Sequence, residues 1–346
     1  MRTDAERSGV DTLDNVTLAK LDRLVRLSGW FPLAIVATVS ALYSPVPETI
    51  RYLPLVASVV LLGLPHGALD YVALPRARAG QVDTRGLAVV GVLYAVLGSA
   101  YLALWWIAPL PAAALFIGLT WFHWGQGELF VVRDLYGAWY LDRSQQVLTT
   151  VVRGGLPMVV PLIGFPDRYR TVLETFVTPF GGQVKSWWVF SPTGRLAVAV
   201  VFGAITIATL ARARRQAGDS CAWRRDATET AILWAFFLVV DPILAIGVYF
   251  CLWHSLRHLV RVGLLDGRVR DGIETGRWLA ASGRVALEAT PPTVGAIALV
   301  GGLFGLVPVS GSIGGAVGLY LVGIAVLTLP HTVIVTWIDR EQGLWL

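Results

Sequence analysis

The chain has 346 residues, of which 55% are hydrophobic and only 15% are charged, and its formal net charge is +5. This balance excludes an ordinary soluble domain and predicts an integral membrane protein. The basic residues gather in particular loops rather than on one amphipathic face, so membrane topology explains the charge better than a nucleic-acid partner does. Two cysteines, Cys221 and Cys251, have no CxxC spacing and indicate neither a disulfide framework nor a zinc site.

The predicted domain organisation is a single helical membrane domain between two short polar ends. Residues 1–26 are polar and lack a signal-peptide pattern, which predicts a cytoplasmic N-terminal segment. The membrane domain is expected over 27–340, followed by a tail at 341–346. A membrane-spanning helix needs about 20 mostly apolar residues. Candidate spans lie, in chain order, at 27–44, 52–72, 86–108, 110–131, 147–164, 193–211, 228–240, 242–262, 293–308 and 314–338. The predicted fold class is all-α, a polytopic transmembrane helix bundle of roughly eight to ten spans.

Three of these regions are irregular. The 228–240 segment is short and is separated from the next span by Asp241 and Pro242, which favours half of a broken helix. The 147–164 segment contains Arg153, glycines and two prolines, which weakens its assignment as a span. The segment 165–192 is rich in basic and aromatic residues and is expected to lie along the membrane interface.

The positions of Lys and Arg in the short loops predict the orientation of the spans. Arginine-rich loops within 76–85, 212–225 and 261–284 are expected on the cytoplasmic side together with the N-terminus. The connections near residues 109, 241 and 310 contain no Lys or Arg and are expected outside. Successive spans therefore alternate in direction through the cell membrane.

The five histidines, His66, His123, His254, His258 and His331, all lie inside predicted spans. A single buried histidine is usually a packing residue, but these five form a group. Their spans all run from outside to inside, and each histidine follows the midpoint of its span. At 1.5 Å per residue they fall within a slab of about 10 Å on the cytoplasmic side of the membrane centre. Strongly polar residues in hydrocarbon are costly and usually functional, so the group predicts a buried metal site of Fe, Zn, Cu or Ni.

His254 and His258 form the strongest pair within this group. They are four residues apart, so both imidazoles are expected on one helix face at a chelating spacing. Arg257 faces away from them and is expected to pair with an acid or to extend to the cytoplasmic interface, the second being favoured.

Polar neighbours of the single histidines are candidates for hydrogen bonds to the ligands. Asp70 is four residues after His66 and could accept its imidazole N–H, with an interfacial charge as the alternative. Gln126 is three residues after His123 and could orient a ligand or a bound water. Glu128 is five residues after His123 and is expected to point elsewhere on a regular helix.

The histidines stand in four strings, PHGALD (65–70), FHWGQ (122–126), WHSLRH (253–258) and LPH (329–331). In this order the strings resemble the Brp/Blh family, the bacteriorhodopsin-related-protein-like β-carotene dioxygenases, and the resemblance covers most of the chain. It implies a membrane-embedded non-haem iron enzyme. Such an enzyme cleaves β-carotene with O₂ at the central 15,15′ double bond and gives two molecules of all-trans-retinal.

Carried over by motif, the resemblance makes His66, His123, His254 and His258 the ligands of Fe(2+). It leaves His331 as a fifth ligand, as a hydrogen-bond donor behind the ligands, or as a residue on the substrate side. No further catalytic residue is implied. The expected partners are β-carotene, O₂ and the lipid bilayer, and an opsin could receive the retinal.

Carotene has no polar group, so its recognition must depend on shape and apolar packing. Aromatic residues that flank the ligands are therefore candidates to line the substrate cavity, with simple packing as the alternative: Trp121, Phe122, Trp124, Phe250 and Trp253.

Two other functions remain open from the sequence. Histidines on membrane helices can ligate haem, although His254 and His258 on one face cannot occupy opposite sides of a single porphyrin. A transporter for retinal or lipid, with structural histidines, would also fit the glycines and the break at Pro242. Neither a Rossmann fingerprint nor a P-loop is found.

Overall fold

A computed structural model describes residues 13–43, 45–185, 187–309 and 311–344. These ranges are helical and contain no strand. Eight helical segments in them are long and apolar enough to cross a membrane, at Asn15–Leu42, Glu48–Ala79, Thr84–Ile107, Arg143–Gly164, Pro192–Ala217, Pro242–Gly263, Trp278–Leu306 and Ile313–Glu341. The chain is therefore a multi-pass membrane protein with an all-α fold, as predicted.

The first half of the described chain contains α1 (Asn15–Leu42), α2 (Glu48–Ser58), α3 (Gly63–Gly67), α4 (Asp70–Ala79), α5 (Thr84–Ile107), α6 (Pro109–Phe130), the π-helix η2 (Val131–Leu135), α7 (Arg143–Gly164) and α8 (Pro166–Val177). The second half contains the short 3₁₀ helices η3 (Thr178–Phe180) and η4 (Trp188–Phe190), then α9 (Pro192–Ala217), α10 (Cys221–Val239), α11 (Pro242–Val248), the π-helix η5 (Tyr249–Ser255), α12 (Leu256–Gly263), α13 (Gly267–Glu274), α14 (Trp278–Leu306) and α15 (Ile313–Glu341).

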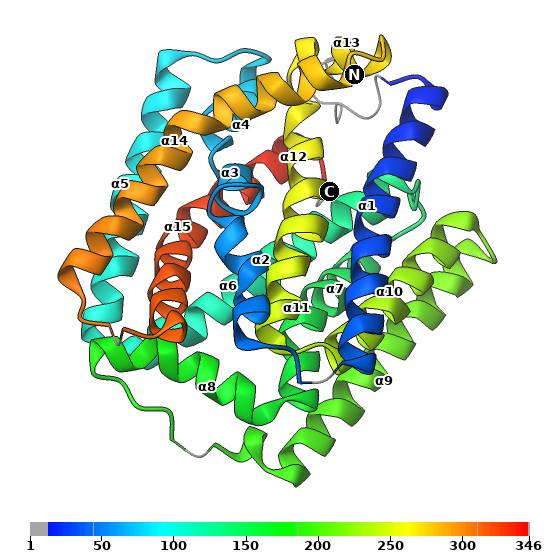
Figure 1. The fold of residues 1–346 in the computed structure, drawn as a ribbon. Helices are drawn as coiled ribbons and strands as arrows, with labels where there is room; N and C mark the ends of the chain where they lie inside the picture. Colours follow the sequence, from blue (N-terminus) through cyan, green and yellow to red (C-terminus); the bar gives the residue numbers. More distant parts are fainter. Residues whose placement is uncertain (1–12, 44, 186, 310, 345–346) are drawn as a thin grey trace.

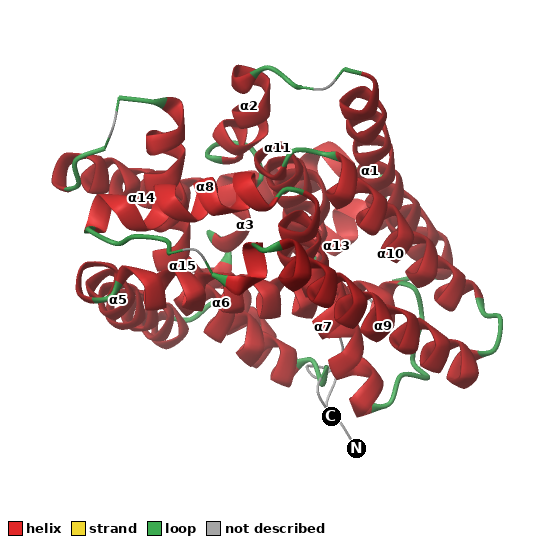
Figure 2. Cartoon of the chain, turned by 90° about the horizontal axis from the view of Figure 1, so that it is seen from below, coloured by secondary structure: helices red, strands yellow, loops and turns green. Residues whose placement is uncertain are grey.

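The long helices form one bundle between two short helices that lie across its ends. Figure 1 shows α8 across the lower end of the bundle and α13 at the upper end. Figure 2, which views the bundle from below, shows α8 lying across the other helices. The position of α8 is the one expected for the interfacial segment 165–192. In Figure 1, α2, the α11–α12 segment and α15 all run from the α8 end toward the α13 end, so histidine-bearing segments share one direction.

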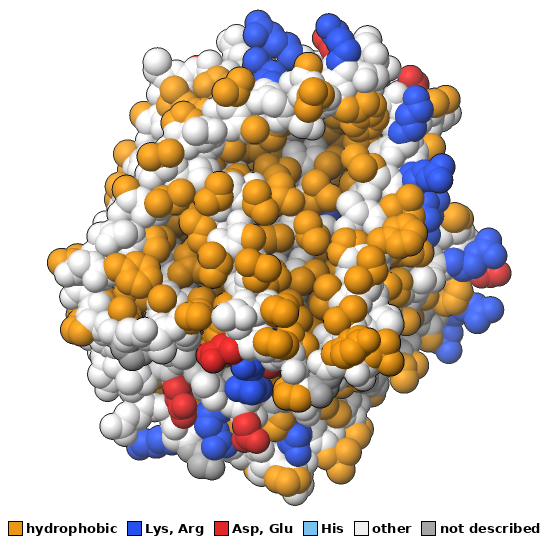
Figure 3. Space-filling view, in the orientation of Figure 1, with side chains coloured by type: hydrophobic (Ala, Val, Ile, Leu, Met, Phe, Trp, Pro, Cys, Tyr) orange, Lys and Arg blue, Asp and Glu red, His pale blue; other side chains and the backbone are white. Residues whose placement is uncertain are grey.

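The surface of the bundle has the distribution of side chains that a membrane protein needs. Apolar side chains cover most of the face in Figure 3, and Lys and Arg gather along its upper and right edges, with further charges at the bottom.

Small residues bring some helices close together. A Cβ atom on Gly125 of α6 would collide with the Thr150 carbonyl of α7, and one on Gly154 of α7 would collide with the Trp121 carbonyl of α6. This close contact fixes α6, which carries His123, against α7.

Two helices begin well before the apolar segments that predicted them. α1 begins at Asn15, where Asp14 caps the helix by accepting a hydrogen bond from the Thr17 N–H, so helix replaces part of the expected polar segment 1–26. Residues 1–12 of that segment lie outside the described ranges. α14 begins at Trp278 rather than near 293. Its first turns carry Arg284 and Glu288, whose ion pair stabilises helix in a stretch that is not apolar.

Two predicted spans have a different local structure. The 52–72 segment is divided into α2, α3 and the start of α4. Gly63 begins α3 at a point where a Cβ atom would lie only 2.6 Å from Ser58 and 2.7 Å from Phe250. The 228–240 segment belongs to the 19-residue helix α10, and α11 starts separately after Asp241, which caps it through the Ile243 N–H. The two are consecutive helices and not halves of one broken helix. Neither α6 nor α10 is among the eight candidate spans.

Candidate metal centre

The five histidines come from five helical elements and meet at one place in the bundle. His66 lies on α3, His123 on α6, His254 on η5, His258 on α12 and His331 on α15. Ring centroids lie 4.5 Å apart for His123 and His331 and 6.3 Å apart for His254 and His258, and the other contacting histidine pairs fall within this range. None of the five is more than 8% exposed. His331 therefore lies among the four histidines assigned by motif.

The irregular backbone of two elements places three of these rings. The Gly63 carbonyl at the start of α3 accepts a hydrogen bond from His66 Nδ1, so Nε2 of His66 is the nitrogen available for a ligand. The π-helix η5 contains His254, and α12 continues the same segment with His258. π-Helices interrupt the regular α-helical phase and are frequent at functional sites. The two rings still stack, with 24° between their planes.

Asp70 holds His331 rather than His66. Its Oδ2 lies 2.8 Å from His331 Nδ1 and accepts a second hydrogen bond, also of 2.8 Å, from Tyr94. The prediction assumed one continuous helix through His66 and Asp70, but α3 ends at Gly67 and α4 begins at Asp70. Because a carboxylate accepts the Nδ1 proton, the Nε2 lone pair of His331 is left for a ligand, the arrangement that many metal-binding histidines have.

Several imidazole nitrogens in the cluster have no protein partner among the described residues. They are Nδ1 of His123, both ring nitrogens of His258, and Nε2 of His331. A buried polar atom without a partner costs about 1–3 kcal/mol. Nε2 of His123 and Nε2 of His254 lie 3.1 Å apart, close to the separation of about 3.0 Å between adjacent ligands that are each about 2.1 Å from one metal.

Two groups of donor atoms within the cluster are close enough to share one ion. Ligand atoms of His66, His123 and His331 lie within 4.8 Å of one another, and so do those of Asp70, His258 and His331. His331 belongs to both groups. The donor set is rich in imidazole and has a single carboxylate at its edge, which suits a transition metal such as iron better than Ca²⁺ or Mg²⁺.

Gln126 does not contact the histidines. Its side-chain amide donates to Thr336 Oγ1 and to Asp339 Oδ2, both at 2.9 Å. Asp339 also accepts a 2.6 Å hydrogen bond from Arg261, which donates in turn to Gln342. We call these five residues the Asp339 cluster. It joins α6, α12 and α15, the elements that carry three of the histidines, on the α13 side of the metal centre.

A second polar group, the Glu128 cluster, consists of Glu128, Arg153, Asp226, Glu229 and Arg257. Arg257 donates to Glu128 at 3.1 Å and to Glu229 at 2.6 Å. Arg153 pairs with Glu128 at 2.9 Å and also with Glu229, and it lies 3.7 Å from Asp226. Arg257 is only 3% exposed, so the preferred prediction that it extends to the interface is wrong and pairing with an acid is correct. Glu128 points away from the histidines, as predicted.

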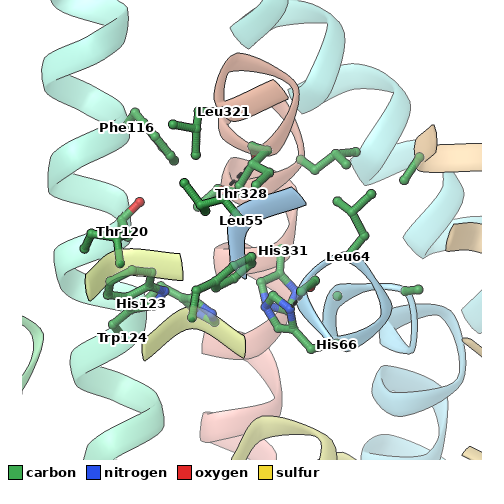
Figure 4. A pocket seen from close by; sticks show the side chains of 18 of the residues that line it. Leu55, Leu64, His66, Phe116, Thr120, His123, Trp124, Leu321, Thr328 and His331 are labelled. Carbon is green, nitrogen blue, oxygen red and sulfur yellow. Dashed lines mark hydrogen bonds between the residues drawn. The ribbon is translucent and has the colours of Figure 1, made fainter. Parts of the chain in front are cut away.

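An apolar cavity of about 560 Å³ lies on the other side of the histidines, and His66, His123 and His331 form part of its wall. Figure 4 shows Phe116 and Thr120 of α6 facing Leu321 and Thr328 of α15 above these rings. The volume is within the range of about 300–1,000 Å³ that is typical of ligand pockets. On α6, η5 and α15, residues that precede the histidines line the cavity, whereas residues that follow them build the two polar clusters.

Only two of the five predicted aromatic residues line this cavity, Trp124 and Phe250. Trp121 instead packs against Phe202 and donates to the Val151 carbonyl.

The remaining two aromatic residues also lie away from the cavity. Phe122 is 40% exposed on the outside of the bundle. Trp253 donates to Glu128 and stacks on Arg257. Consecutive residues on a helix are about 100° apart, so a neighbour of a ligand normally faces another direction.

The cavity reaches the outer surface of the bundle between α5 and α14. Leu87 and Gly91 of α5 and Gly295 of α14 line it and are exposed. A Cβ atom on either glycine would meet no atom within 4 Å, so the opening is free of side chains at these positions. Both helices are candidate membrane spans, so we expect the opening to face lipid.

Sequence reasoning missed the lining residues Thr120 and Thr328 and the two polar clusters. Each threonine is three residues before a histidine on the same helix, a spacing that places both side chains on one face. The signal for the clusters was the presence of charged residues within otherwise apolar segments.

Comparisons with known proteins identify the family of the chain. A sequence model of the β-carotene 15,15′-dioxygenase family matches residues 57–339, a range that contains all five histidines. The chain is 50% identical, over 91% of its length and 92% of the relative, to the probable β-carotene 15,15′-dioxygenase Blh of Halobacterium salinarum. It is 30% identical to the probable β-carotene 15,15′-dioxygenase Brp of the same species, over 83% of both chains. No solved structure matches it. The chain belongs to the β-carotene 15,15′-dioxygenase family.

Proposed function

We propose that this protein is a membrane-embedded non-haem iron enzyme that cleaves β-carotene with O₂ at the 15,15′ double bond into two molecules of all-trans-retinal. The observation that carries the proposal is a cluster of five buried imidazoles in the wall of an apolar cavity. Family membership supports the substrate and the position of cleavage.

The reaction balances without a further reductant. The C=C double bond of one C₄₀ hydrocarbon breaks and two C=O bonds form, so the two cleaved carbons lose four electrons and the two oxygen atoms gain them. Iron, when bound, supplies the redox chemistry that makes dioxygen reactive toward an alkene. The protein has to hold the metal, bring the central double bond to it and exclude other reactants.

The residues present fit Fe(2+) as the metal. Neutral imidazoles are good ligands for iron, and Nε2 of His331 and one ring nitrogen of His258 would gain a partner when a metal binds. We assign His66, His123, His254 and His258 as ligands. His331 is assigned as a fifth, because Asp70 binds its Nδ1 and its Nε2 is unpartnered within the cluster.

The shape of the cavity supports cleavage near the middle of a long hydrocarbon. One set of lining residues lies on α6, α7, α8 and α11, and includes Ile117, Met158 and Phe176. Another lies on α4, α5 and α14, and includes Val90 and Leu299. His66, His123 and His331 line the same cavity. We propose that the central region of a bound polyene lies at these histidines and that apolar contacts alone hold its two ends.

A haem site is not favoured by this geometry. Two axial histidines of one haem must face each other across a flat macrocycle roughly 10 Å wide, with the iron bound at about 2 Å from each nitrogen. Here His123 has ring contacts with four other imidazoles at 4.5–6.3 Å, so a porphyrin between any two of them would overlap the others.

The test is expression of the chain in bacterial cells that accumulate β-carotene. We expect the orange colour to fade and all-trans-retinal to appear, identified by chromatography and mass. His254→Ala is expected to abolish retinal formation and to lower the iron content of the purified protein. Thr206→Val, a buried change on α9 that is remote from the cavity lining, is the matched control. Unchanged carotene in cells that contain folded, iron-loaded protein would disprove the proposal.

A further inference from the structure

The hydroxyl groups that line the cavity differ in their hydrogen bonds. Tyr94 donates to Asp70, and Thr328 donates to the carbonyl of Ile324 one turn earlier on α15. Thr120 also lines the cavity, but its Oγ1 is buried and has no partner within the described residues. A buried hydroxyl without an acceptor is unfavourable, so a cavity ligand with an acceptor at this place would gain a hydrogen bond.

The Thr120 hydroxyl lies on the same side of α6 as His123 of the histidine cluster. Thr120 lies on α6 three residues before His123, so both side chains are on the same side of the helix. It is 6% exposed. Figure 4 shows its hydroxyl oxygen directed toward the cavity beside His123. The surrounding wall here is apolar, with Phe116 on one side and Trp124 on the other.

The substrate does not explain a hydrogen-bond donor at this position, because β-carotene contains no oxygen. Each product contains one aldehyde oxygen, and this oxygen is on the carbon that was cleaved. It is therefore formed at the histidines and not at the distant ends of the cavity. A carbonyl oxygen accepts hydrogen bonds and cannot donate them, which matches a free hydroxyl donor.

We propose that the Thr120 hydroxyl donates a hydrogen bond to the aldehyde oxygen of the retinal that forms on its side of the metal centre. The inference rests on the proposed function and adds a binding residue for the product. It separates two kinds of ligand in one cavity: the hydrocarbon depends on apolar contacts, and the aldehyde depends in addition on Thr120.

The experiment measures the binding of two probes to the purified full-length protein without oxygen, so that no turnover occurs. The probes are all-trans-retinal and β-carotene, titrated by quenching of tryptophan fluorescence. Thr120→Val removes the hydroxyl and keeps the shape. We expect it to raise the Kd for retinal about tenfold, equivalent to about 1.4 kcal/mol, and to change the Kd for β-carotene less than about twofold. Thr120→Ser retains a hydroxyl and is expected to bind retinal nearly as wild type does.

Two further variants make the result specific. Thr149→Val removes another buried, unpartnered hydroxyl, on α7 and outside the cavity lining, and should leave both dissociation constants unchanged. Tyr169→Phe removes a phenol that lines the cavity on α8. Weaker retinal binding in Tyr169→Phe with unchanged binding in Thr120→Val would overturn the assignment of Thr120. Equal losses for retinal and β-carotene in Thr120→Val would also overturn it.

The outcome is distinguishable from failure of the proposed function. If wild-type protein forms retinal from β-carotene and Thr120→Val binds retinal normally, only the role of Thr120 is wrong. If wild-type protein neither forms nor binds retinal, the proposed function itself is wrong.

Discussion

The two sides of the histidine cluster are built from opposite kinds of side chain. Toward α8, the histidine-bearing helices contribute Phe116, Ile246 and Leu321 to an apolar cavity. Toward α13, the same helices contribute Glu128, Arg257 and other charged residues to the two polar clusters. Under the proposed function, one side would receive the hydrocarbon and the other would fix the helices that carry the histidines.

The charged side has a clear physical consequence for stability. Ion pairs in a low-dielectric interior are strong only while each charge keeps its partner. The Glu128 cluster joins α6 to α7, α10 and α12 through side chains that are at most 6% exposed. Loss of one member leaves the remaining buried charges with fewer partners. By contrast, a small change in the apolar wall removes only a few contacts with a ligand.

Among the variants that test the two sides of the histidine cluster, Arg257→Met on the charged side is expected to have the largest effect. It removes one of the two guanidinium groups that Glu128 and Glu229 share and should destabilise the folded protein by about 3–5 kcal/mol. The measurement is the thermal unfolding midpoint in detergent, together with the fraction of monodisperse protein. Arg212→Met, at an exposed pair with Asp142, is the control and should change the midpoint little. Equal midpoints for the two variants would show that the buried cluster is not a stabilising clamp.

A smaller effect is expected for Asp70→Asn, which weakens the acceptor that holds His331 Nδ1. Iron affinity should fall about 10- to 100-fold, the usual cost of losing a carboxylate behind a metal-binding histidine. Iron titration of the metal-free protein measures the affinity, and excess iron should restore part of the retinal formation. Asp142→Asn changes an exposed acid that pairs with Arg212, outside both polar clusters, and should leave iron affinity unaltered. Wild-type affinity in Asp70→Asn would argue against His331 as a ligand.

The smallest effect is expected for Ile324→Val in the cavity wall. It removes one methylene group from the contact with carotene, worth about 0.8 kcal/mol, so kcat/KM for β-carotene should fall about fourfold. Iron content and the unfolding midpoint should stay close to wild type. Ile297→Val, an exposed position on α14, serves as the control. A loss of iron in Ile324→Val would show that the two sides of the cluster are not functionally separate.

The clustering of the histidines could be anticipated from the sequence because the predicted topology assigns a depth in the membrane to each residue. Alternating spans placed all five histidines in one half of the bilayer, and the four-residue spacing paired His254 with His258. The direction of individual side chains could not be read in the same way. The interruption between α3 and α4 changed the partner of Asp70, and helix rotation turned Trp253 away from the cavity.

The buried ion pairs could not be predicted from the sequence, for a different reason. Hydropathy describes segments one at a time, whereas Arg153, Glu229 and Arg257 meet only after three helices have packed. Their favourable energy depends on partners 28 and 76 residues apart in sequence. A charged residue in an apolar segment signals that a partner exists, but it does not identify that partner.

The opening between α5 and α14 affects how the enzyme must be assayed. Leu87, Gly91 and Gly295 lie on two candidate membrane spans, so we expect carotene to reach the cavity from the lipid without passing through water. The concentration that governs saturation is then the mole fraction of carotene in the surrounding lipid or detergent. Diluting the carotene with more lipid at a fixed molar amount lowers the rate, just as withdrawing substrate does in an aqueous assay.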